Sequence, residues 1–318
     1  MRIFRSLEDL PRFEKAVVTL GTFDGVHRGH QAVLNLLKEK AREIRGETVL
    51  LTFWPHPRLV LNPEDQNIKL LNTLEEKVGL LEKAGLDNLV IIEFTKEFAA
   101  LDYKEFVAQV LVSKIGTKVL AIGHDHHFGR NREGTFQQLE KLAPDHGFEV
   151  VQIPEFREGD ENISSTVIRN ALLHGETEKA NDYLGYPYMV SGTVVHGDKT
   201  GRTLGFPTAN IKVEEPYKLI PAKGIYITEI FFEKSRYEGV SSLGYRPTFF
   251  GKDKTLEVNI FNFDKEIYSE KIIVFFIAYL RDELKFANIE ALIRQMNADK
   301  QLAIAYFINT LKDKHLEK

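Results

Sequence analysis

The amino-acid sequence predicts a mixed α/β chain of two domains, a parallel-sheet domain followed by a small antiparallel β-barrel with a terminal helix. Between residues 16 and 154, short β-branched runs alternate with amphipathic stretches, which is typical of parallel strands joined by crossover helices. Beyond residue 187, short strand-like segments follow one another closely, which favours a small barrel or sandwich. Gly185, Tyr186 and Pro187 break the helical pattern between these two regions. We therefore predict domains over residues 1–185 and 186–318.

Five strands and their crossover helices are expected in the first domain, which we predict to be Rossmann-like. The strands are expected at 17–20, 48–53, 89–94, 119–122 and 149–153. A helix follows the first strand, and its apolar residues recur at helical spacing: Val33, Leu36, Leu37 and Ile44. Thr73 and Glu76 match a capping box, and Gly85 ends that helix. Further helices are expected around 106–111 and 136–142, and up to residues 173 and 184.

The second domain is expected to contain five short strands and a final helix. The strands are expected at 189–195, 224–232, 237–243, 256–263 and 271–280. The last of them contains the longest apolar run of the chain, from Ile272 to Leu280, which is far shorter than the ~18 residues of a membrane helix. We therefore expect a buried strand there. The final helix is expected to carry one apolar stripe: Ile289, Leu292, Ile293 and Met296.

Composition excludes several classes of protein. Hydrophobic residues make up 43% and charged residues 28% of the chain, as in a soluble globular protein. The net charge of −4 provides no general attraction to nucleic acid or to an anionic membrane, so we expect neither partner. Zero cysteines exclude disulfides, thiolate metal sites and a cysteine nucleophile. Glu8 and Asp9 make a signal peptide improbable, and we expect a cytoplasmic protein.

The loop after the first strand has the composition of an anion-binding site. His27 and His30 stand three apart between a strand and a helix N-terminus, where backbone amides attract phosphate oxygens. Gly29 lets a ligand approach the backbone closely. A plain helix start with two exposed histidines is the alternative interpretation. No G-x-G-x-x-G fingerprint occurs here, which disfavours a dinucleotide-dependent oxidoreductase.

Two further loops are expected at the same edge of the sheet. Residues 52–58 bring aromatic, proline and cationic side chains to the end of the second strand, where a planar ligand could pack. Residues 123–132 form another polar loop after the fourth strand. Because the carboxyl ends of parallel strands share one edge, three loops should meet at one site. Residues 163–169 add hydroxyls and a guanidinium at a helix start, where a simple N-cap explains the serines alone.

The number of histidines also permits a metal site as an alternative. The possible ligands lie in three separate loops: His27, His30, His56, His124, His126 and His127, with Asp24 and Asp125. No H-E-x-x-H spacing is present, so we favour the phosphate-binding interpretation.

Residues 21–30, 52–58, 123–129 and 163–169 together resemble the adenylyltransferase half of the bifunctional bacterial riboflavin kinase/FAD synthetases. The resemblance implies that this domain transfers AMP from ATP to FMN and releases pyrophosphate. It implies catalytic contacts of His27 and His30 with the phosphates. The other implied nucleotide contacts are Gly21, Phe23, Asp24, Gly25, Gly29, Asp125, Ser164, Ser165, Thr166 and Arg169. The implied flavin side consists of Phe53, Pro55, His56, Pro57 and Phe128.

The second domain begins with a glycine-rich stretch that could wrap phosphates. Four glycines fall within residues 192–210, but the P-loop pattern is absent. Thr208 and Asn210 lie two apart on an extended segment, so their oxygens point the same way and suit Mg²⁺. Alternation over 256–261 puts Glu257 and Asn259 on a polar strand face. A carboxylate there could accept a hydroxyl proton, although a solvated strand charge is the ordinary interpretation.

Residues 197–210, 242–249, 256–263 and 280–286 resemble the riboflavin kinase domain of the same family. The resemblance implies transfer of the γ-phosphoryl group of ATP to riboflavin, which gives FMN. It implies Glu257 as general base, Thr208 and Asn210 as ligands of Mg²⁺–ATP, and Arg281 beside the flavin. The implied phosphate-binding loop contains Gly197, Lys199, Gly201, Arg202, Gly205 and Pro207. Five positions depart from the common family pattern: Thr22, Ser242, Asn259 and the pair His126-His127.

The sequence therefore predicts a magnesium-dependent enzyme with two ATP-using sites and small-molecule substrates. Two alternatives stay open. A flavin-binding regulator would bind FMN without turning it over, and Thr22 permits that interpretation. A histidine-ligated metallohydrolase would contain zinc and ignore riboflavin.

Overall fold

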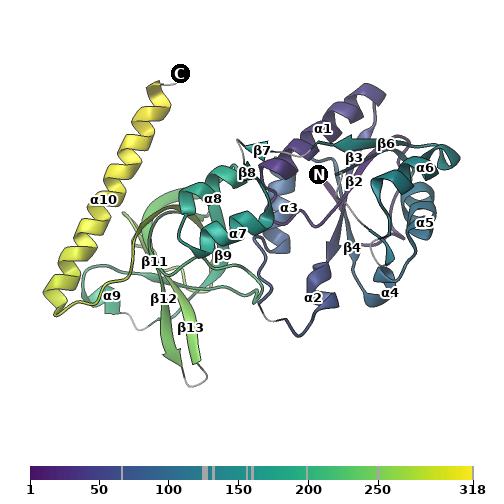
Figure 1. Cartoon of the computed structure of the whole chain (residues 1–318). Helices are drawn as coiled ribbons and strands as arrows, with labels where there is room; N and C mark the ends of the chain where they lie inside the picture. The colour runs from purple at the N-terminus through teal and green to yellow at the C-terminus, as the bar shows by residue number, and fades with distance from the viewer. Residues whose placement is uncertain are drawn as a thin grey trace. The chain divides into compact units, whose positions relative to one another are not determined.

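The predicted fold class is confirmed: a parallel sheet with flanking helices forms the first part of the chain, and a closed antiparallel barrel with a terminal helix forms the second (Figure 1). The structure is a computed structural model that describes residues 1–65, 67–123, 128–130, 133–154, 157–158, 161–197, 200–248 and 251–316. The chain forms two compact units, Met1–Ser165 and Thr166–Lys318. The domain boundary at 185/186 stays a prediction.

Six parallel strands form the sheet of the first unit, in the order β1-β4-β3-β2-β5-β6. Their bounds are β1 Arg2–Phe4, β2 Ala16–Leu20, β3 Glu47–Trp54, β4 Asn88–Glu93, β5 Thr117–Gly123 and β6 Glu149–Ile153. All five predicted strands are present. The sequence did not reveal β1, because three residues are too few to show a strand pattern. The order reverses at β2, whose neighbours are β3 and β5, so the crevice at such a switch point lies at the carboxyl end of β2.

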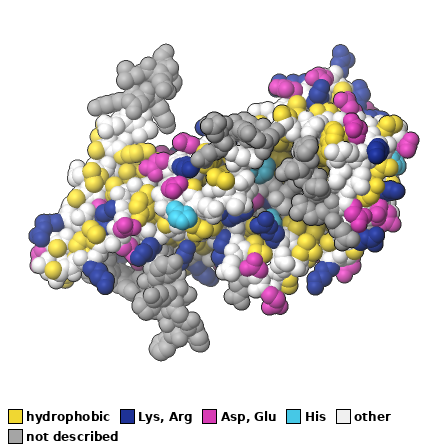
Figure 2. All heavy atoms as spheres, viewed as in Figure 1, with side chains coloured by type: hydrophobic (Ala, Val, Ile, Leu, Met, Phe, Trp, Pro, Cys, Tyr) yellow, Lys and Arg dark blue, Asp and Glu magenta, His cyan; other side chains and the backbone are white. Residues whose placement is uncertain are grey.

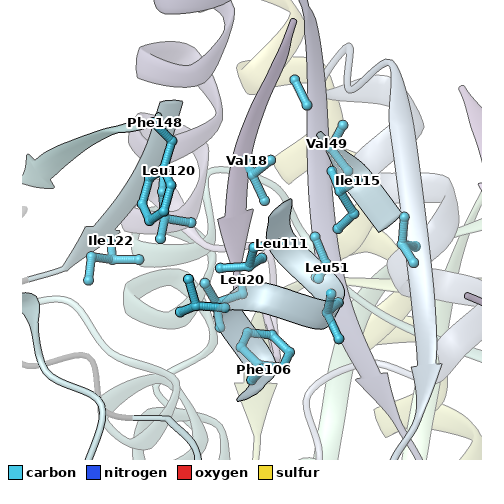
Figure 3. Close-up of a cluster of buried hydrophobic side chains, with 14 of the residues drawn as sticks. Val18, Leu20, Val49, Leu51, Phe106, Leu111, Ile115, Leu120, Ile122 and Phe148 are labelled. Atoms are coloured by element: carbon cyan, nitrogen blue, oxygen red, sulfur yellow. The ribbon is translucent and has the colours of Figure 1, made fainter. Parts of the chain in front are cut away.

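Helices cover both faces of this sheet. Their bounds are α1 Arg28–Ile44, α2 Pro57–Leu61, α3 Leu74–Lys83, α4 Lys96–Ala99, α5 Tyr103–Phe106, the π-helix η1 Val107–Ile115 and α6 Phe136–His146. A two-stranded ribbon follows, with β7 Arg157–Glu158 and β8 Glu161–Asn162. Figure 3 shows the core on one face, a single buried cluster that includes Val49, Leu51, Phe106 and Leu111, with Phe148 beside Leu120. Leu50, between Val49 and Leu51 in sequence, packs on the opposite face, so both sides of β3 are buried as expected for a parallel sheet.

The start of α3 is fixed by the predicted capping box. The hydroxyl of Thr73 accepts a hydrogen bond from the backbone N–H of Glu76 at 3.1 Å, and the Glu76 carboxylate accepts one from the N–H of Thr73 at 3.0 Å. Two backbone donors at the helix start are thereby satisfied reciprocally.

The barrel of the second unit closes through the pairing of β9 with β10. The strand order is β10-β13-β12-β11-β14-β9. The bounds are β9 Tyr188–Val195, β10 Ala209–Lys212, β11 Gly224–Phe232, β12 Ser235–Thr248, β13 Gly251–Ile260 and β14 Lys271–Arg281. The five predicted strands are confirmed, and the apolar run Ile272–Leu280 lies within β14. The sequence did not reveal β10, because it is a four-residue strand that follows a glycine-rich loop.

Four helices accompany the barrel: α7 Ser165–Leu173, α8 Thr177–Leu184, α9 Thr200–Thr203 and α10 Ile289–Leu316. The side-chain amide of Asn181 in α8 donates to the carbonyls of Phe276 and Ile277 at 2.9 and 3.1 Å. Its oxygen accepts from the N–H of Tyr188 at 2.7 Å. One side chain thus satisfies backbone groups of both β14 and β9.

The terminal helix is buried further along than its predicted stripe. Ile289 is 59% exposed, whereas Asp299, Ala303 and Phe307 are buried. Ala303 and Phe307 pack against Phe261 of the barrel. Leu292, Ile293 and Met296 of the predicted stripe are half-buried, so the prediction fails only at its first residue, and the same helical face continues to the buried Ala303 and Phe307.

The described part of the chain contains no helix that is long and apolar enough to cross a membrane. On the face drawn in Figure 2, positive and negative side chains are intermingled, in keeping with the small net charge of −4. The charge distribution of this face provides no single-sign patch for steering a large polyanion.

Replacing Thr73 by alanine tests the capping box. We expect Thr73→Ala to lower the free energy of unfolding of the first unit by about 1 kcal/mol, because the backbone N–H of Glu76 loses the hydroxyl that accepts its hydrogen bond. The chain's single tryptophan, Trp54, lies in β3, so urea denaturation followed by its fluorescence monitors the first unit. The control is Asn288→Ala, which removes the side chain that accepts from the N–H of Ala291 in α10. Equal shifts of the Trp54 transition in both variants would contradict the assignment.

Candidate active sites

A cavity of about 820 Å³ opens at the carboxyl ends of β2, β3 and β5 in the first unit. Its volume lies within the range of about 300–1,000 Å³ that is common for small-molecule sites. The predicted loops contribute Gly21, Phe23, His30, Phe53, Pro57, Gly123 and Phe128 to its lining. The three loops therefore meet at one site, as the parallel sheet predicts.

The loop between β2 and α1 has an unusual backbone conformation, and hydrogen bonds to another segment of the chain hold it in place. Phe23 and Val26 have φ values of 47° and 37°, which residues other than glycine rarely adopt. The buried carboxylate of Asp24 accepts hydrogen bonds from the backbone N–H groups of Leu71 and Asn72 at 2.8 and 3.3 Å. Asp24 thus ties the loop to the segment that precedes α3. Such backbone strain is typical of sites where a surrounding framework holds functional groups in place.

His27 and His30 stack face to face in this loop. Their ring centroids are 3.7 Å apart with an interplanar angle of 22°, and Phe23 stacks on the other side of His30 at 4.5 Å. The Nδ1 atom of His27 accepts from the N–H of His30 at 3.4 Å and caps the start of α1. His27 is buried, whereas His30 lines the cavity. His30 is therefore the imidazole of the pair that a ligand can contact.

The surroundings of His30 oppose its protonation. Burial, and then the nearby His27 and Lys77, hold the pKa of His30 well below its ordinary value of 6.5. The ring is therefore neutral at physiological pH, with one N–H donor and one acceptor nitrogen. Its Nδ1 atom is buried and makes no hydrogen bond with the described residues.

Much of the remaining cavity lining is aromatic. The ring of Phe53 lies 5.7 Å from that of Phe94 and 5.7 Å from that of Phe98, while Phe106 and Phe128 are 5.6 Å apart. Sequence reasoning missed Phe94 and Phe98 as lining residues. Phe94 ends the strand predicted at 89–94, so the carboxyl-end rule applied to that strand could have found it. Phe98 carries no such signal, because its position depends on how α4 packs.

Several predicted residues have other contacts or lie elsewhere. Pro55 is exposed, and the Nδ1 atom of buried His56 accepts from the N–H of Arg58 at 3.2 Å, which caps α2. The hydroxyl of Ser165 donates to the carbonyl of Asp24 at 2.8 Å. Thr166 and Arg169 belong to the second unit, where the Arg169 guanidinium donates to the Thr166 hydroxyl at 3.2 Å. Ser164 is half-buried.

The metal-site alternative is tested only in part. Asp125, His124, His126 and His127 lie outside the described residues. Within the described ranges, no three His, Asp or Glu side chains are grouped so that they could hold a metal ion.

A second candidate site lies on the barrel, around Glu257. Glu257 on β13 faces Asn210 on β10 and Ser242 on β12 in the strand register. The hydroxyl of Thr208 donates to the Glu257 carboxylate at 3.4 Å. The predicted alternation is confirmed, because Leu256, Val258 and Ile260 are buried while Glu257 and Asn259 are partly exposed. Thr208, just ahead of β10, thus comes together with Asn210 on β10 and Glu257 on β13.

The glycine-rich loop packs directly on these residues. A Cβ atom on Gly197 would lie 2.5 Å from Cγ of Asn210, and one on Gly201 would lie 2.4 Å from the carbonyl oxygen of Phe206. Only glycine therefore allows the loop to approach so closely. The side-chain amide of Asn259 donates to the carbonyl of Pro207 at 2.8 Å and holds the end of the loop.

A cavity of about 400 Å³ adjoins this loop. Among its lining residues are Arg202, Pro207, Thr208, Ile260, Glu266 and Tyr268. Arg202 forms an exposed ion pair with Glu266 at 3.4 Å, and Gly205 is exposed with a φ of 82°. Lys199 lies outside the described residues.

Arg281 is bound to the terminal helix. Its guanidinium donates to both carboxylate oxygens of Asp299, at 2.8 and 2.6 Å, and to the carbonyl of Asp282 at 2.7 Å. Gln295 donates to the same carboxylate at 2.9 Å. The partner Asp299 was not predicted, because its pairing depends on where α10 packs.

Known proteins resemble both units. The family model described as FAD synthetase matches residues 10–167, and the one described as riboflavin kinase matches residues 184–307. A bifunctional riboflavin kinase/FMN adenylyltransferase from Listeria monocytogenes is 42% identical over 92% of both chains. Its namesake from Bacillus subtilis is 38% identical over 94% of both chains, and that from Escherichia coli is 36% identical over 96% of this chain and 98% of its own.

A solved structure also matches along the chain. It is described as a macrolide-efflux protein from Streptococcus pneumoniae, and it aligns with a TM-score of 0.87 and 31% identity over 95% of this chain and 97% of its own.

Replacing Asp299 tests the clamp between β14 and α10. Asp299→Ala leaves the partly buried Arg281 without its carboxylate partner, which should cost about 3 kcal/mol of local stability. Amide hydrogen exchange in α10 should then be roughly 100-fold faster than in the unchanged protein. Gln301→Ala, an exposed change in the same helix, is the control and should leave the exchange rates unaltered. Protection in Asp299→Ala equal to that of the control would show that the pair does not hold α10.

Proposed function

Because this chain belongs to the family of bifunctional riboflavin kinase/FMN adenylyltransferases, we propose that the cavity of the first unit is its adenylyltransferase site and that the Thr208–Glu257 cluster is its kinase site. The enzyme phosphorylates riboflavin to FMN with ATP in its C-terminal part. It then adenylylates FMN to FAD in its N-terminal part and releases pyrophosphate. The product of the second unit is thus a substrate of the first.

One observation carries the assignment of the adenylyltransferase site: His30, Phe53 and Phe128 line the same cavity at the carboxyl edge of the parallel sheet. One side of this cavity offers an imidazole and the start of a helix, which suit phosphates. The other side offers phenylalanine rings, which suit the planar isoalloxazine of FMN. We propose that the phosphates of ATP lie beside His30, and the flavin against Phe53, Phe94 and Phe98.

The adenylyl transfer needs no nucleophile from the protein. A phosphate oxygen of FMN forms a bond with the α-phosphorus of ATP, and the bond from that phosphorus to pyrophosphate breaks. Negative charge builds up on the oxygens around the α-phosphorus, so hydrogen-bond donors already in position lower the barrier. We propose that the neutral His30 ring donates its one N–H there. His27 keeps that ring in place by stacking and by capping α1. Ser165, Thr166, Arg169 and Asp125 remain predicted nucleotide contacts.

The kinase site has the groups that a phosphoryl transfer to a hydroxyl requires. We propose that Glu257 accepts the proton of the ribityl hydroxyl as that oxygen forms a bond with the γ-phosphorus and ADP leaves. The Thr208 hydroxyl and the Asn210 amide oxygen are hard oxygen donors next to a loop that packs closely on them, and this set fits Mg²⁺. Bound there, Mg²⁺ would neutralise charge on the phosphates of ATP.

The contacts of other predicted kinase residues refine their roles. Asn259 stands where the family commonly has histidine, and its amide holds the Pro207 carbonyl. We propose that Asn259 fixes the loop and takes no part in proton transfer. Arg281 is committed to Asp299 and Asp282, so we propose that it orients the end of β14 near the flavin. We also propose a cytoplasmic setting, with riboflavin, FMN and ATP as the small-molecule partners.

Substituting His30 separates the two activities. We expect His30→Ala to slow formation of FAD from supplied FMN by about 10²- to 10³-fold, because donors to the transition state are lost. Phosphorylation of riboflavin should be unchanged, and it serves as the control within the same chain. Chromatographic separation of riboflavin, FMN and FAD after incubation with Mg²⁺–ATP measures both rates. An equal loss of both activities would contradict two separate sites.

Substituting Glu257 should give the reverse pattern. Glu257→Gln keeps the shape of the side chain but removes the proton acceptor, so FMN formation should fall by about 10²-fold or more. FAD formation from supplied FMN should persist. Glu270→Gln, an exposed change just ahead of β14, is the matched control. Unaltered riboflavin phosphorylation in Glu257→Gln would remove this residue from the role of base.

A further inference from the structure

A lysine lies buried directly behind the wall of the adenylyltransferase cavity. Lys77 of α3 is 1% exposed, and its ammonium donates to the carbonyl of Thr22 at 2.7 Å. The ammonium also lies 5.7 Å from the ring centroid of Trp54. Thr22 lines the cavity, so Lys77 reaches the site through the backbone of the loop between β2 and α1. Sequence reasoning assigned no role to this residue.

Burial of the Lys77 ammonium is unfavourable, so the groups that surround it indicate the role of its charge. Removing an ammonium from water costs several kcal/mol unless other groups compensate. Two titratable groups of the loop face Lys77: the carboxylate of Asp24, which favours its charge, and the imidazole of His30, whose protonation its charge opposes. His27, stacked on His30, is the remaining titratable group of this cluster. A neutral hydrogen-bond donor would be enough to bind the Thr22 carbonyl. The positive charge of Lys77 therefore needs a further explanation.

Lys77 acts on two of the cavity-lining residues of the loop, Thr22 and His30. The hydrogen bond to Thr22 fixes the backbone just before Phe23, where φ is 47°. The same ammonium, together with His27, disfavours a proton on His30, whose Nδ1 atom has no hydrogen-bond partner in the described structure. A fixed positive charge thus lies behind a neutral imidazole. A triphosphate in the cavity would experience that positive field without the loss of the imidazole's acceptor nitrogen.

We propose that Lys77 is a positioning residue for adenylyl transfer, which holds the Thr22 carbonyl and supplies positive charge behind the phosphate site. This inference rests on the proposed adenylyltransferase site. Lys77 itself does not contact the substrates, because the Thr22 backbone stands between its ammonium and the cavity. Desolvation lowers the pKa of Lys77 to about 8, against the effect of Asp24, so the lysine loses its charge within a measurable pH range.

The sign of each pH effect follows from these contacts. In the unchanged enzyme, kcat/KM for FAD formation should fall as pH rises through about 8, because Lys77 then becomes neutral. In Lys77→Arg the side chain stays charged over that range, so this alkaline fall should disappear. In Lys77→Met the positive charge is gone at all pH values. His30 should then take up a proton at a higher pH than before, because one of the charges that oppose its protonation is removed.

The test measures FAD formation from FMN between pH 5 and 9 in the full chain, with kcat and KM determined separately. For Lys77→Met we expect at least a 10-fold lower kcat and an acid limb of the profile displaced to higher pH. Lys83→Met, an exposed change on the same helix, is the control and should match the unchanged enzyme. Riboflavin phosphorylation should be the same in all four proteins.

An independent readout is the NMR titration of the His30 ring, assigned by comparison with His30→Ala. Its midpoint should move to higher pH in Lys77→Met and stay in place in Lys77→Arg and Lys83→Met. If the unchanged enzyme forms no FAD, the proposed function fails, whereas the titration still tests the effect of Lys77 on His30. An unmoved His30 titration in Lys77→Met would overturn the proposal, and so would an alkaline limb near pH 8 that persists in Lys77→Arg. Should Lys77→Met fail to fold by Trp54 fluorescence, the Lys77→Arg profile alone decides.

Discussion

The carboxylate of Asp24 is the constraint on which the first site depends. It is buried, and it binds the backbone amides of Leu71 and Asn72, which precede the capping box of α3. A loop with positive φ at Phe23 and Val26 would relax toward ordinary conformations without such an anchor. The carbonyl of Asp24 also accepts from Ser165, so both the side chain and the backbone of one residue join distant segments. The stacked imidazoles are placed by these bonds, and the chemistry of the cavity follows from that placement.

The two proposed sites offer different means of binding phosphate. In the parallel sheet, the switch point at β2 brings a helix start and several strand ends together, and a ligand meets backbone amides and a neutral imidazole. On the barrel, glycines at 197 and 201 let a loop pack directly against Asn210 and Phe206. The first site depends on the strand order of the sheet, and the second depends on glycines, which have no side chain to block the approach of the loop. Neither requires a large net positive charge, in agreement with the value of −4 for the chain.

Much of this could be predicted from sequence, and the failures have physical reasons. Strands of five or more residues and their loops carry local patterns, so the sheet, most of the barrel and the meeting of His30, Phe53 and Phe128 were predicted correctly. The short strands β1 and β10 form only because distant partners pair with them. In the sequence, Lys77 is indistinguishable from an exposed lysine of a helix. Its burial depends on how α3 packs on the loop between β2 and α1. The pairing of Arg281 with Asp299 spans two elements whose packing no local pattern specifies.

Asn181 has a consequence for anyone who wishes to study the two halves separately. Its side chain satisfies the carbonyls of Phe276 and Ile277 and the N–H of Tyr188, so α8 completes the hydrogen bonding of the barrel wall. A fragment that started after this helix would expose those three backbone groups to water and would lose a lateral brace on β14. A kinase fragment made for crystallisation or calorimetry should therefore begin ahead of α8, although the sequence pattern assigns that helix to the first domain.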